Sequence, residues 1–317
     1  MTRVLLTCPP MIGIAEEMRP VFAARGATLV IPDFVQVMAE DALVDLVPGF
    51  EGWIIGDDPA TARVLEAGCA GALRACVKWG VGVDNVDFEA ARRLGLPVTN
   101  TPGVFGAEVA DLAMHYVTGL ARETYEIDRG VRAGGWPKPR GISLAGRRAV
   151  LVGFGDIGRQ TARRLLAAGL TVTVIDPAFV PAEAPVGIER GIERGIERGV
   201  WPEALERADF AIFTCPLTPE THHMLDDTAL ARARPGLRVV NVARGPVIDE
   251  AALVRALDGG RVHSAALDVF EIEPLPAESP LRAHPHCLFG SHNGSNTEDA
   301  VRRVSTLAAE LLFEALG

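Results

Sequence analysis

The segment Ala149–Gly158, AVLVGFGDIG, constrains the fold more than any other part of the chain. It places Gly153, Gly155 and Gly158 in the spacing G-x-G-x-x-G directly after an apolar β-like run, and a helical pattern from 159 to 168 follows. Glycines at these positions permit a tight turn and close approach of the backbone to a pyrophosphate. The N-terminus of the following helix offers free N–H groups and a positive dipole end to that anion. The spacing therefore predicts a dinucleotide-binding βαβ unit.

A carboxylate, Asp176, follows the next β-like run, Thr171–Ile175. At the tip of the second strand of such a unit, a carboxylate accepts hydrogen bonds from the ribose hydroxyls of NAD and repels the 2′-phosphate of NADP. Pro177 and Ala178 follow, without an Arg or Lys to neutralise a phosphate. The pattern favours NAD as the cofactor. A glycine turn without a ligand and an S-adenosylmethionine site are the alternatives that this segment alone leaves open.

The chain has 317 residues, which suggests two domains, and β-like runs alternate with helical patterns along both halves. Strands that alternate with helices form parallel βαβ units, so we expect an α/β protein with two doubly wound parallel-sheet domains. In the first hundred residues the runs are Val4–Thr7, Thr28–Ile31, Trp53–Ile55, Ala75–Trp79 and Pro97–Asn100. From Arg148 onward they are Ala149–Val152, Thr171–Ile175, Phe210–Thr214, Arg238–Asn241, Ser264–Leu267 and Cys287–Phe289.

Two segments interrupt this alternation. An amphipathic stretch from about Val104 to Ala133 predicts a long helix, and a Gly- and Pro-rich loop follows over 134–146. The tandem repeat GIERGIERGIERG, Gly187–Gly199, predicts a surface insertion without a catalytic role. A Gly at every fourth position costs a helix about 1 kcal/mol each, and three units of four residues are too short for a solenoid. A lid edge near the adenine end of the cofactor is the alternative.

Composition argues against several classes of protein. The formal net charge is −10, so we expect no nucleic-acid partner, which would need a basic face. The cysteines show no CxxC spacing, which indicates reduced thiols in a cytoplasmic protein and no metal site. We expect neither a membrane span nor a signal peptide, because no run of about 18 apolar residues occurs and the N-terminus lacks a cleavage pattern. The cysteines are Cys8, Cys69, Cys76, Cys215 and Cys287.

Three later segments carry groups suited to catalysis. In NVARGPVIDEAAL, Arg244 lies just past a β-like run, where open α/β sheets bind ligands. A guanidinium there can hold a substrate carboxylate with two hydrogen bonds, although a surface ion pair is the alternative for an isolated Arg. ALDVFEIEPLP carries Asp268, Glu271 and Glu273, and GSHNGSN carries His292. A carboxylate beside an imidazole favours the imidazolium, which can protonate a carbonyl oxygen as a hydride arrives and take the proton back in reverse.

The order of these motifs resembles the D-isomer-specific 2-hydroxyacid dehydrogenase family, which includes D-3-phosphoglycerate dehydrogenase. KWGVGVDNVD (Lys78–Asp87), VTNTPG (Val98–Gly103) and CPLTPET (Cys215–Thr221) extend the match over nearly the whole chain. The resemblance implies an oxidoreductase that transfers a hydride between NAD(H) and a small D-2-hydroxy acid or its 2-oxo partner. It also implies a Rossmann-type NAD-binding domain, residues 101–291, inserted in a flavodoxin-like substrate domain, residues 1–100 and 292–317.

The resemblance assigns roles to individual residues. The catalytic residues are Arg244, which binds the substrate carboxylate, His292 as acid and base, and Glu273, rather than Glu271, as the support of His292. The substrate-binding positions also include Lys78, and Val81 and Gly82 present N–H groups to the substrate carboxylate. The cofactor-binding positions are Gly153, Gly155, Asp156, Ile157, Gly158, Asp176, Cys215, Val242, Ala243 and Asp268.

The resemblance also implies an oligomeric state. At a few positions this chain carries a residue that differs from the one usual in the family. A homodimer through the helix that starts near Val104 is expected, with an ordinary monomer core as the alternative. Ser291 stands where Pro usually precedes the catalytic His, and Asp111 stands where Glu is usual. The chain is expected to be a short form without the regulatory domain of longer phosphoglycerate dehydrogenases.

The substrate is less constrained than the reaction. Asp57 and Asp58 follow the third β-like run, where phosphoglycerate enzymes often carry a basic residue, although Lys78 matches a position that is commonly basic in them. Because two carboxylates oppose a phosphate unless they are paired, we predict that phosphoglycerate is not the best substrate. Glyoxylate, hydroxypyruvate and bulkier 2-oxo acids stay open. An NAD-sensing corepressor-like binding protein without turnover is the alternative function; a formate dehydrogenase is disfavoured, because those relatives place Gln at the position of Glu273.

Overall fold

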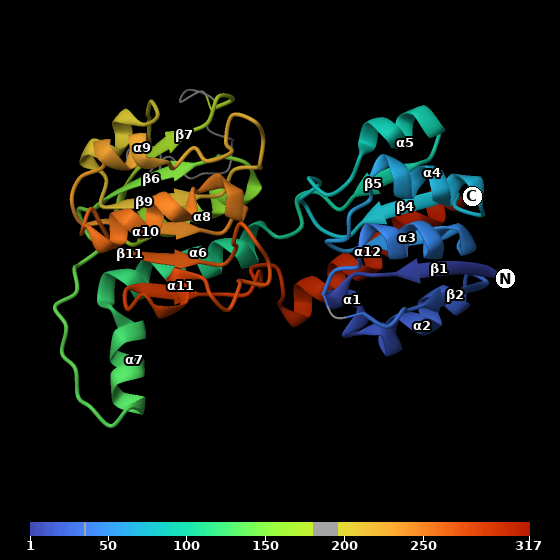
Figure 1. Ribbon diagram of the computed structural model, residues 1–317, viewed down its shortest axis with the longest axis horizontal. Helices are drawn as coiled ribbons and strands as arrows, with labels where there is room; N and C mark the ends of the chain where they lie inside the picture. Colours follow the sequence, from blue (N-terminus) through green and yellow to red (C-terminus); the bar gives the residue numbers. More distant parts are fainter. Residues whose placement is uncertain (35, 180–195) are drawn as a thin grey trace. The chain divides into compact units, whose positions relative to one another are not determined.

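The computed structural model describes residues 1–34, 36–179 and 196–317. The chain divides into two compact units, Met1–Phe105 with Ser295–Gly317, and Gly106–Gly294. Each unit has one sheet, of five and seven strands respectively, in which every described strand pair is parallel (Figure 1). The prediction of two parallel-sheet α/β domains is confirmed. The second unit includes His292, whereas the sequence analysis assigned this residue to the first unit, at the start of its C-terminal segment 292–317.

The first unit has the strand order β2-β1-β3-β4-β5. This is the flavodoxin-like order of doubly wound sheets, in which the strand order reverses between β1 and β3. Its strands are β1 Thr2–Leu6, β2 Ala27–Val30, β3 Gly52–Ile55, β4 Ala75–Lys78 and β5 Val98–Asn100. Its helices are α1 Pro9–Ile12, α2 Ala15–Ala23, α3 Glu40–Leu46, α4 Ala62–Ala70, α5 Phe88–Leu94 and α12 Glu298–Leu316, with the short 3₁₀ helix η1 at Val47–Gly49.

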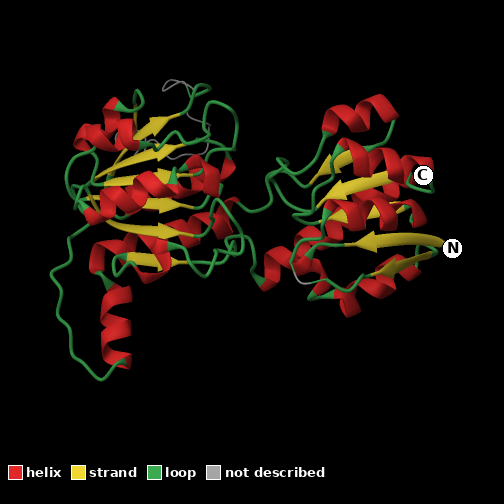
Figure 2. Cartoon of the chain, viewed as in Figure 1, coloured by secondary structure: helices red, strands yellow, loops and turns green. Residues whose placement is uncertain are grey.

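The sheet of the first unit is covered by helices, and its strands are accordingly apolar (Figure 2). All residues of β3 and β4 are buried, which is typical of parallel strands packed on both faces. The C-terminal helix α12 packs on these two strands and begins with a side-chain cap, in which the hydroxyl of Thr297 accepts a hydrogen bond from Ala300 N. The last residues of the chain therefore complete the core that the first hundred begin.

The second unit has the strand order β12-β11-β10-β9-β6-β7-β8. Numbered within the unit, this is the Rossmann order extended by one strand, with the reversal between β6 and β9. Its strands are β6 Arg148–Val152, β7 Thr171–Ile175, β8 Ile196–Arg198, β9 Phe210–Phe213, β10 Leu237–Asn241, β11 Val262–Leu267 and β12 Cys287–Phe289. Its helices are α6 Gly106–Arg122, α7 Thr124–Arg132, α8 Asp156–Ala167, α9 Asp227–Arg232, α10 Glu250–Asp258 and α11 Pro280–Ala283, with 3₁₀ helices η4 at Glu203–Arg207 and η5 at Gly245–Val247.

The tandem repeat contributes to this sheet. Residues 187–195 of the repeat lie outside the described residues, but Ile196–Arg198 form β8, which pairs in parallel with β7. The described end of the repeat is an edge strand with Glu197 and Arg198 exposed, so its surface position agrees with the expectation, whereas its pairing with the sheet was not expected. The packing of this strand favours glycine at position 199, since a Cβ there would overlap the side chains of Thr173 and Ile175.

The long amphipathic stretch forms two helices rather than the expected one. Glu123 separates α6 from α7 with a φ of 54°, in the left-handed region. A non-glycine residue there ends the α-helical hydrogen bonding although the apolar pattern continues on both sides. No described helix is both long and apolar enough to cross a membrane.

Candidate active site

The glycine turn lies at the reversal of strand order in the second unit. Gly153 follows β6 with a φ of 90°, and a Cβ there would lie 2.7 Å from the backbone N of Cys215, which follows β9. A Cβ on Gly158 would overlap the carbonyl oxygen of Gly153. Only glycine fits the first position, because it must combine positive φ with this close approach. α8 begins at Asp156, so its first N–H groups open at the crevice where doubly wound sheets bind ligands.

Asp176 supports this turn from the end of β7. Its Oδ2 accepts a hydrogen bond from Phe154 N at 2.7 Å, and its Oδ1 accepts one from Ala178 N at 2.8 Å. A carboxylate has about four acceptor sites, so both oxygens can still accept hydrogen bonds from ribose hydroxyls. Asp176 therefore has the position and the acceptor capacity that the sequence analysis assigned to it. Beside the turn, burial raises the pKa of Cys215 to about 12, which makes this residue a neutral thiol.

Arg244 follows β10 in a turn that is braced by Asn241. The side-chain Nδ2 of Asn241 donates to Arg244 O at 2.9 Å, and its Oδ1 accepts from Ala243 N at 3.0 Å. The guanidinium Nη1 of Arg244 donates to Ala243 O at 2.9 Å. Val242 and Ala243 are buried within this turn. The side-chain amide of Asn241 thus stabilises the turn that carries Arg244, the proposed carboxylate-binding residue.

Glu273 and His292 form the pair that the sequence predicted. The His292 Nδ1 lies 2.7 Å from Glu273 Oε2, while Glu273 Oε1 accepts a hydrogen bond from Phe270 N at 2.9 Å. The two side chains are about one-third exposed, at 31% and 32%. A carboxylate fixed by the backbone N–H of Phe270 in this way orients the imidazole, and the second ring nitrogen is then the atom suited to exchange a proton with a substrate.

Backbone packing brings Arg244 to the segment that carries Glu273. A Cβ on Gly245 would overlap the carbonyl group of Phe270, so the two chain segments touch directly at this point. Next to it, Glu250 and Glu271 exchange hydrogen bonds: Glu250 N donates to Glu271 Oε1 at 3.0 Å, and Glu271 N donates to Glu250 Oε1 at 2.7 Å. Glu271 therefore ties two loops together, whereas Glu273 holds His292, as the sequence analysis had distinguished them.

Asp268 is buried and serves the His292 loop. Its Oδ1 accepts hydrogen bonds from the hydroxyl of Tyr116 and from Asn293 N, both at 3.2 Å, and its Oδ2 accepts one from Gly294 N at 2.9 Å. The family resemblance implies a cofactor-binding role for Asp268, and its contacts within the chain indicate a second, structural role. They hold the loop that follows β12.

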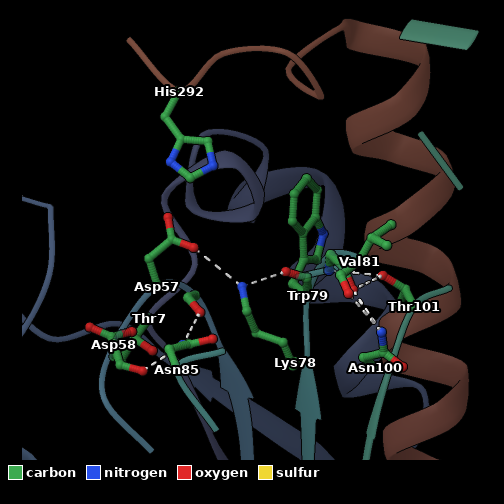
Figure 3. Close-up of polar contacts among 12 residues, drawn as sticks. Thr7, Asp57, Asp58, Lys78, Trp79, Val81, Asn85, Asn100, Thr101 and His292 are labelled. Carbon is green, nitrogen blue, oxygen red and sulfur yellow. Dashed lines mark hydrogen bonds and ion pairs between the residues drawn. The ribbon is translucent and has the colours of Figure 1, made fainter. Parts of the chain in front are cut away.

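The predicted substrate-binding residues of the first unit lie at the carboxyl end of its sheet (Figure 3). Lys78 ends β4 and is only 4% exposed. Its Nζ donates to Trp79 O at 3.0 Å and lies 3.3 Å from Asp57 Oδ1. Val81 is exposed, and its carbonyl accepts a hydrogen bond from Asn100 Nδ2 at 3.2 Å; the neighbouring Gly82 is half-buried. Lys78 thus lies beside a carboxylate.

The second carboxylate of this segment, Asp58, is not available to a ligand in the same way. It is buried, its Oδ1 accepts a hydrogen bond from Met38 N at 2.8 Å, and burial raises its pKa. The carbonyl oxygen of Asp58 also accepts from Asn85 Nδ2 at 2.6 Å (Figure 3). Of the two carboxylates, Asp57 is therefore the one that forms an ion pair with Lys78.

Sequence reasoning missed two residues that shape the site. Asn241 was visible as the polar residue that ends a β-like run, and its position directly before the Arg244 turn could have indicated its bracing role. Tyr116 gave no such signal, because its apolar helical environment is typical of a core residue and its partner, Asp268, lies 152 positions away.

Comparison with known proteins gives the same picture. Residues 114–294 match the model of the D-isomer specific 2-hydroxyacid dehydrogenase, NAD binding domain. The chain is 33% identical over 285 residues to the hydroxypyruvate reductase of Thermotoga maritima, a match that covers 88% of this chain and 89% of that protein. It is 37% identical over 258 residues to D-3-phosphoglycerate dehydrogenase 2, chloroplastic, of Arabidopsis thaliana, a match that covers 81% of this chain and 40% of that protein.

Structural comparison extends the match over the whole fold. The TT0316 protein from Thermus thermophilus superimposes with a TM-score of 0.83 at 32% identity, over 99% of this chain and 96% of that one. The chain spans only about half the length of several curated relatives, namely 40%, 44% and 58% of three D-3-phosphoglycerate dehydrogenases. The matched domain, the two parallel sheets and the coverage of similar reductases together show that the chain belongs to the D-isomer specific 2-hydroxyacid dehydrogenase family.

Proposed function

We propose that the protein is an NAD-dependent dehydrogenase that interconverts a small D-2-hydroxy acid and its 2-oxo acid. The observation that carries the proposal is the 2.7 Å contact between His292 Nδ1 and Glu273 Oε2, in the same unit as the glycine turn and joined to the Arg244 segment through Gly245 and Phe270. An NAD-sensing corepressor-like protein would need the glycine turn but not this pair, and no observation favours it.

The residues of the second unit fit NAD, and different residues bind the cofactor, bind the substrate and transfer the proton. Gly153, the N-terminus of α8 and Asp176 are suited to hold the pyrophosphate and the adenosine ribose, and bound NADH would supply the hydride. Arg244 binds the substrate carboxylate through charge-assisted hydrogen bonds. His292, oriented by Glu273, gives a proton to the carbonyl oxygen during reduction and removes it from the hydroxyl during oxidation.

The expected assembly and domain bounds rest on the family resemblance, and the expected location rests on the cysteine pattern. We expect a homodimer through α6, a cytoplasmic location, and a substrate domain built from residues 1–100 and 292–317, with the NAD-binding domain over 101–291. Lys78, Val81 and Gly82 are proposed to bind substrate. Asp156, Ile157, Val242, Ala243 and Asp268 are proposed to contact the cofactor beside the glycines, Asp176 and Cys215.

The substrate preference is predicted from the pair of Lys78 and Asp57. Because the carboxylate of Asp57 lies 3.3 Å from the buried ammonium, much of the positive charge that a phosphate would need is already neutralised. We expect glyoxylate or hydroxypyruvate to be reduced with NADH more efficiently than phosphohydroxypyruvate. Initial rates over a panel of 2-oxo acids give kcat/KM for each. A preference for phosphohydroxypyruvate by two orders of magnitude would overturn this expectation, and absence of turnover with every acid would refute the proposed activity.

The cofactor preference is predicted from Asp176. The wild type should prefer NADH to NADPH, and Asp176→Asn should narrow that preference by about tenfold, since a neutral amide no longer repels a 2′-phosphate but can still accept a hydrogen bond from Phe154 N. The measurement is kcat/KM for both cofactors. Asp226→Asn, which alters the N-cap of α9 instead, is the matched control and should leave the ratio unchanged. A wild type that prefers NADPH would show the ribose argument to be wrong.

A further inference from the structure

The carboxylate of Asp268 is enclosed by three donors that come from two distant parts of the chain. The hydroxyl of Tyr116 on α6 and the N–H of Asn293 donate to Oδ1, both at 3.2 Å, and the N–H of Gly294 donates to Oδ2 at 2.9 Å. Asp268 is 2% exposed and Tyr116 is 3% exposed. A buried carboxylate needs such donors, because an unsatisfied one would bear the full cost of desolvation.

The same residue also holds His292 through its backbone. His292 N donates to Asp268 O at 2.6 Å, so the main chain and the side chain of Asp268 together hold three consecutive residues, 292–294. His292 has a φ of 55°, in the left-handed region. A non-glycine residue in that region is strained and persists only where its surroundings hold it in that conformation. The contacts of Asp268 supply that constraint.

Tyr116 is the only side chain among these donors. Burial raises the pKa of Tyr116, and the adjacent Asp268 carboxylate raises it further, so the phenol stays protonated and donates throughout the range of ordinary assays. The loop that follows β12 packs tightly on this hydrogen bond. A Cβ on Gly290 would overlap both the Asp268 carboxylate and the Tyr116 hydroxyl, so the loop passes directly over this contact.

We infer that Tyr116 is a positioning residue, whose hydrogen bond to Asp268 fixes the 292–294 turn and thereby the imidazole of His292 against Glu273. The inference rests on the proposed function, in which His292 is the acid and base. It adds to that function a residue from α6, outside every motif that carries the family resemblance. Loss of the Tyr116 hydroxyl should let the 292–294 turn shift, while the hydrogen bond between the glycine turn and Asp176 stays intact.

The test is Tyr116→Phe, which removes one hydroxyl and keeps the buried ring. We expect kcat to fall about tenfold, the scale of a small misplacement of a reacting group, while KM for NADH stays within about twofold. Tyr125→Phe is the matched control: it makes the same change at the only other tyrosine, which is also buried but lies on α7. This control should leave kcat unchanged. All rates are measured well below the unfolding temperature of each variant.

A second readout makes the result independent of turnover. In ¹⁵N-edited spectra of the imidazoles, the signal of His292, assigned by its loss in His292→Gln, should shift or broaden in Tyr116→Phe and stay in place in Tyr125→Phe. A fall in kcat of the same size in both tyrosine variants, or an unmoved His292 signal with unchanged kcat in Tyr116→Phe, would overturn the positioning role. A wild type inactive with every 2-oxo acid would instead refute the proposed function, and the spectra would still decide whether Tyr116 holds His292.

Discussion

Replacement of His292 by Gln is expected to lower kcat at least about a hundredfold, while the affinity for NADH stays close to that of the wild type. Gln can keep a hydrogen bond to Glu273 but cannot exchange a proton at neutral pH, and general acid–base catalysis typically contributes a factor of about 10²–10⁴. The cofactor should still bind, because the glycine turn and Asp176 follow β6 and β7, whereas His292 follows β12, the edge strand four positions from β6 in the sheet. Steady-state rates with a 2-oxo acid and NADH fluorescence titration measure the two effects separately.

The control for this variant is His222→Gln, which makes the same substitution at an exposed position between β9 and α9. Its kcat should match that of the wild type. Near-normal turnover in His292→Gln would remove His292 from the mechanism, and loss of NADH binding in the same variant would point to a general collapse of the second unit instead of a lost proton donor.

Replacement of Arg244 by Lys is expected to lower kcat/KM for the 2-oxo acid by about a hundredfold, mainly through a higher KM. Lysine keeps the charge but loses the planar fork that holds a carboxylate with two hydrogen bonds, and one hydrogen bond to a charged group contributes about 1.5–3 kcal/mol. The turn itself should persist, because its brace comes from the side chain of Asn241 to the main chain of residue 244. The affinity for NADH is therefore expected to change little.

Arg255→Lys provides the matched control, since Arg255 forms an exposed ion pair with Asp227 on the surface of α10. Surface pairs of this kind contribute little, and the control should show unchanged kinetics. If Arg244→Lys kept a normal KM for every substrate tested, the carboxylate of the substrate would have to be bound elsewhere.

The parts of the site that lie in one stretch of sequence could be predicted from it. Each predicted β-like run is a strand, and none of their ends is displaced by more than two residues, because buried parallel strands read as short apolar runs between helical patterns. The glycine turn and Asp176 were placed correctly for the same reason, since the requirement for positive φ at Gly153 is local to the turn.

Features that depend on distant partners could not be predicted in this way. The break at Glu123 keeps the helical apolar pattern on both sides, so only its φ reveals it. β8 forms because the end of the repeat pairs with the edge of β7. A four-residue period in the sequence does not predict this pairing. The hydrogen bond between Tyr116 and Asp268 joins α6 to the end of β11. Its existence depends on the tertiary fold, and a tyrosine in an apolar helix predicts only a core residue.

The most direct measurement of the central claim follows a label from the cofactor to the substrate. The protein is incubated with NADH that carries deuterium at both hydrogen positions of nicotinamide C4, together with a prochiral 2-oxo acid, and the product is analysed by mass and by chiral chromatography. The account predicts a D-2-hydroxy acid with deuterium at C2, formed by the wild type and depleted at least about a hundredfold with His292→Gln. An unlabelled product, a product of the L configuration or no product from the wild type would contradict it.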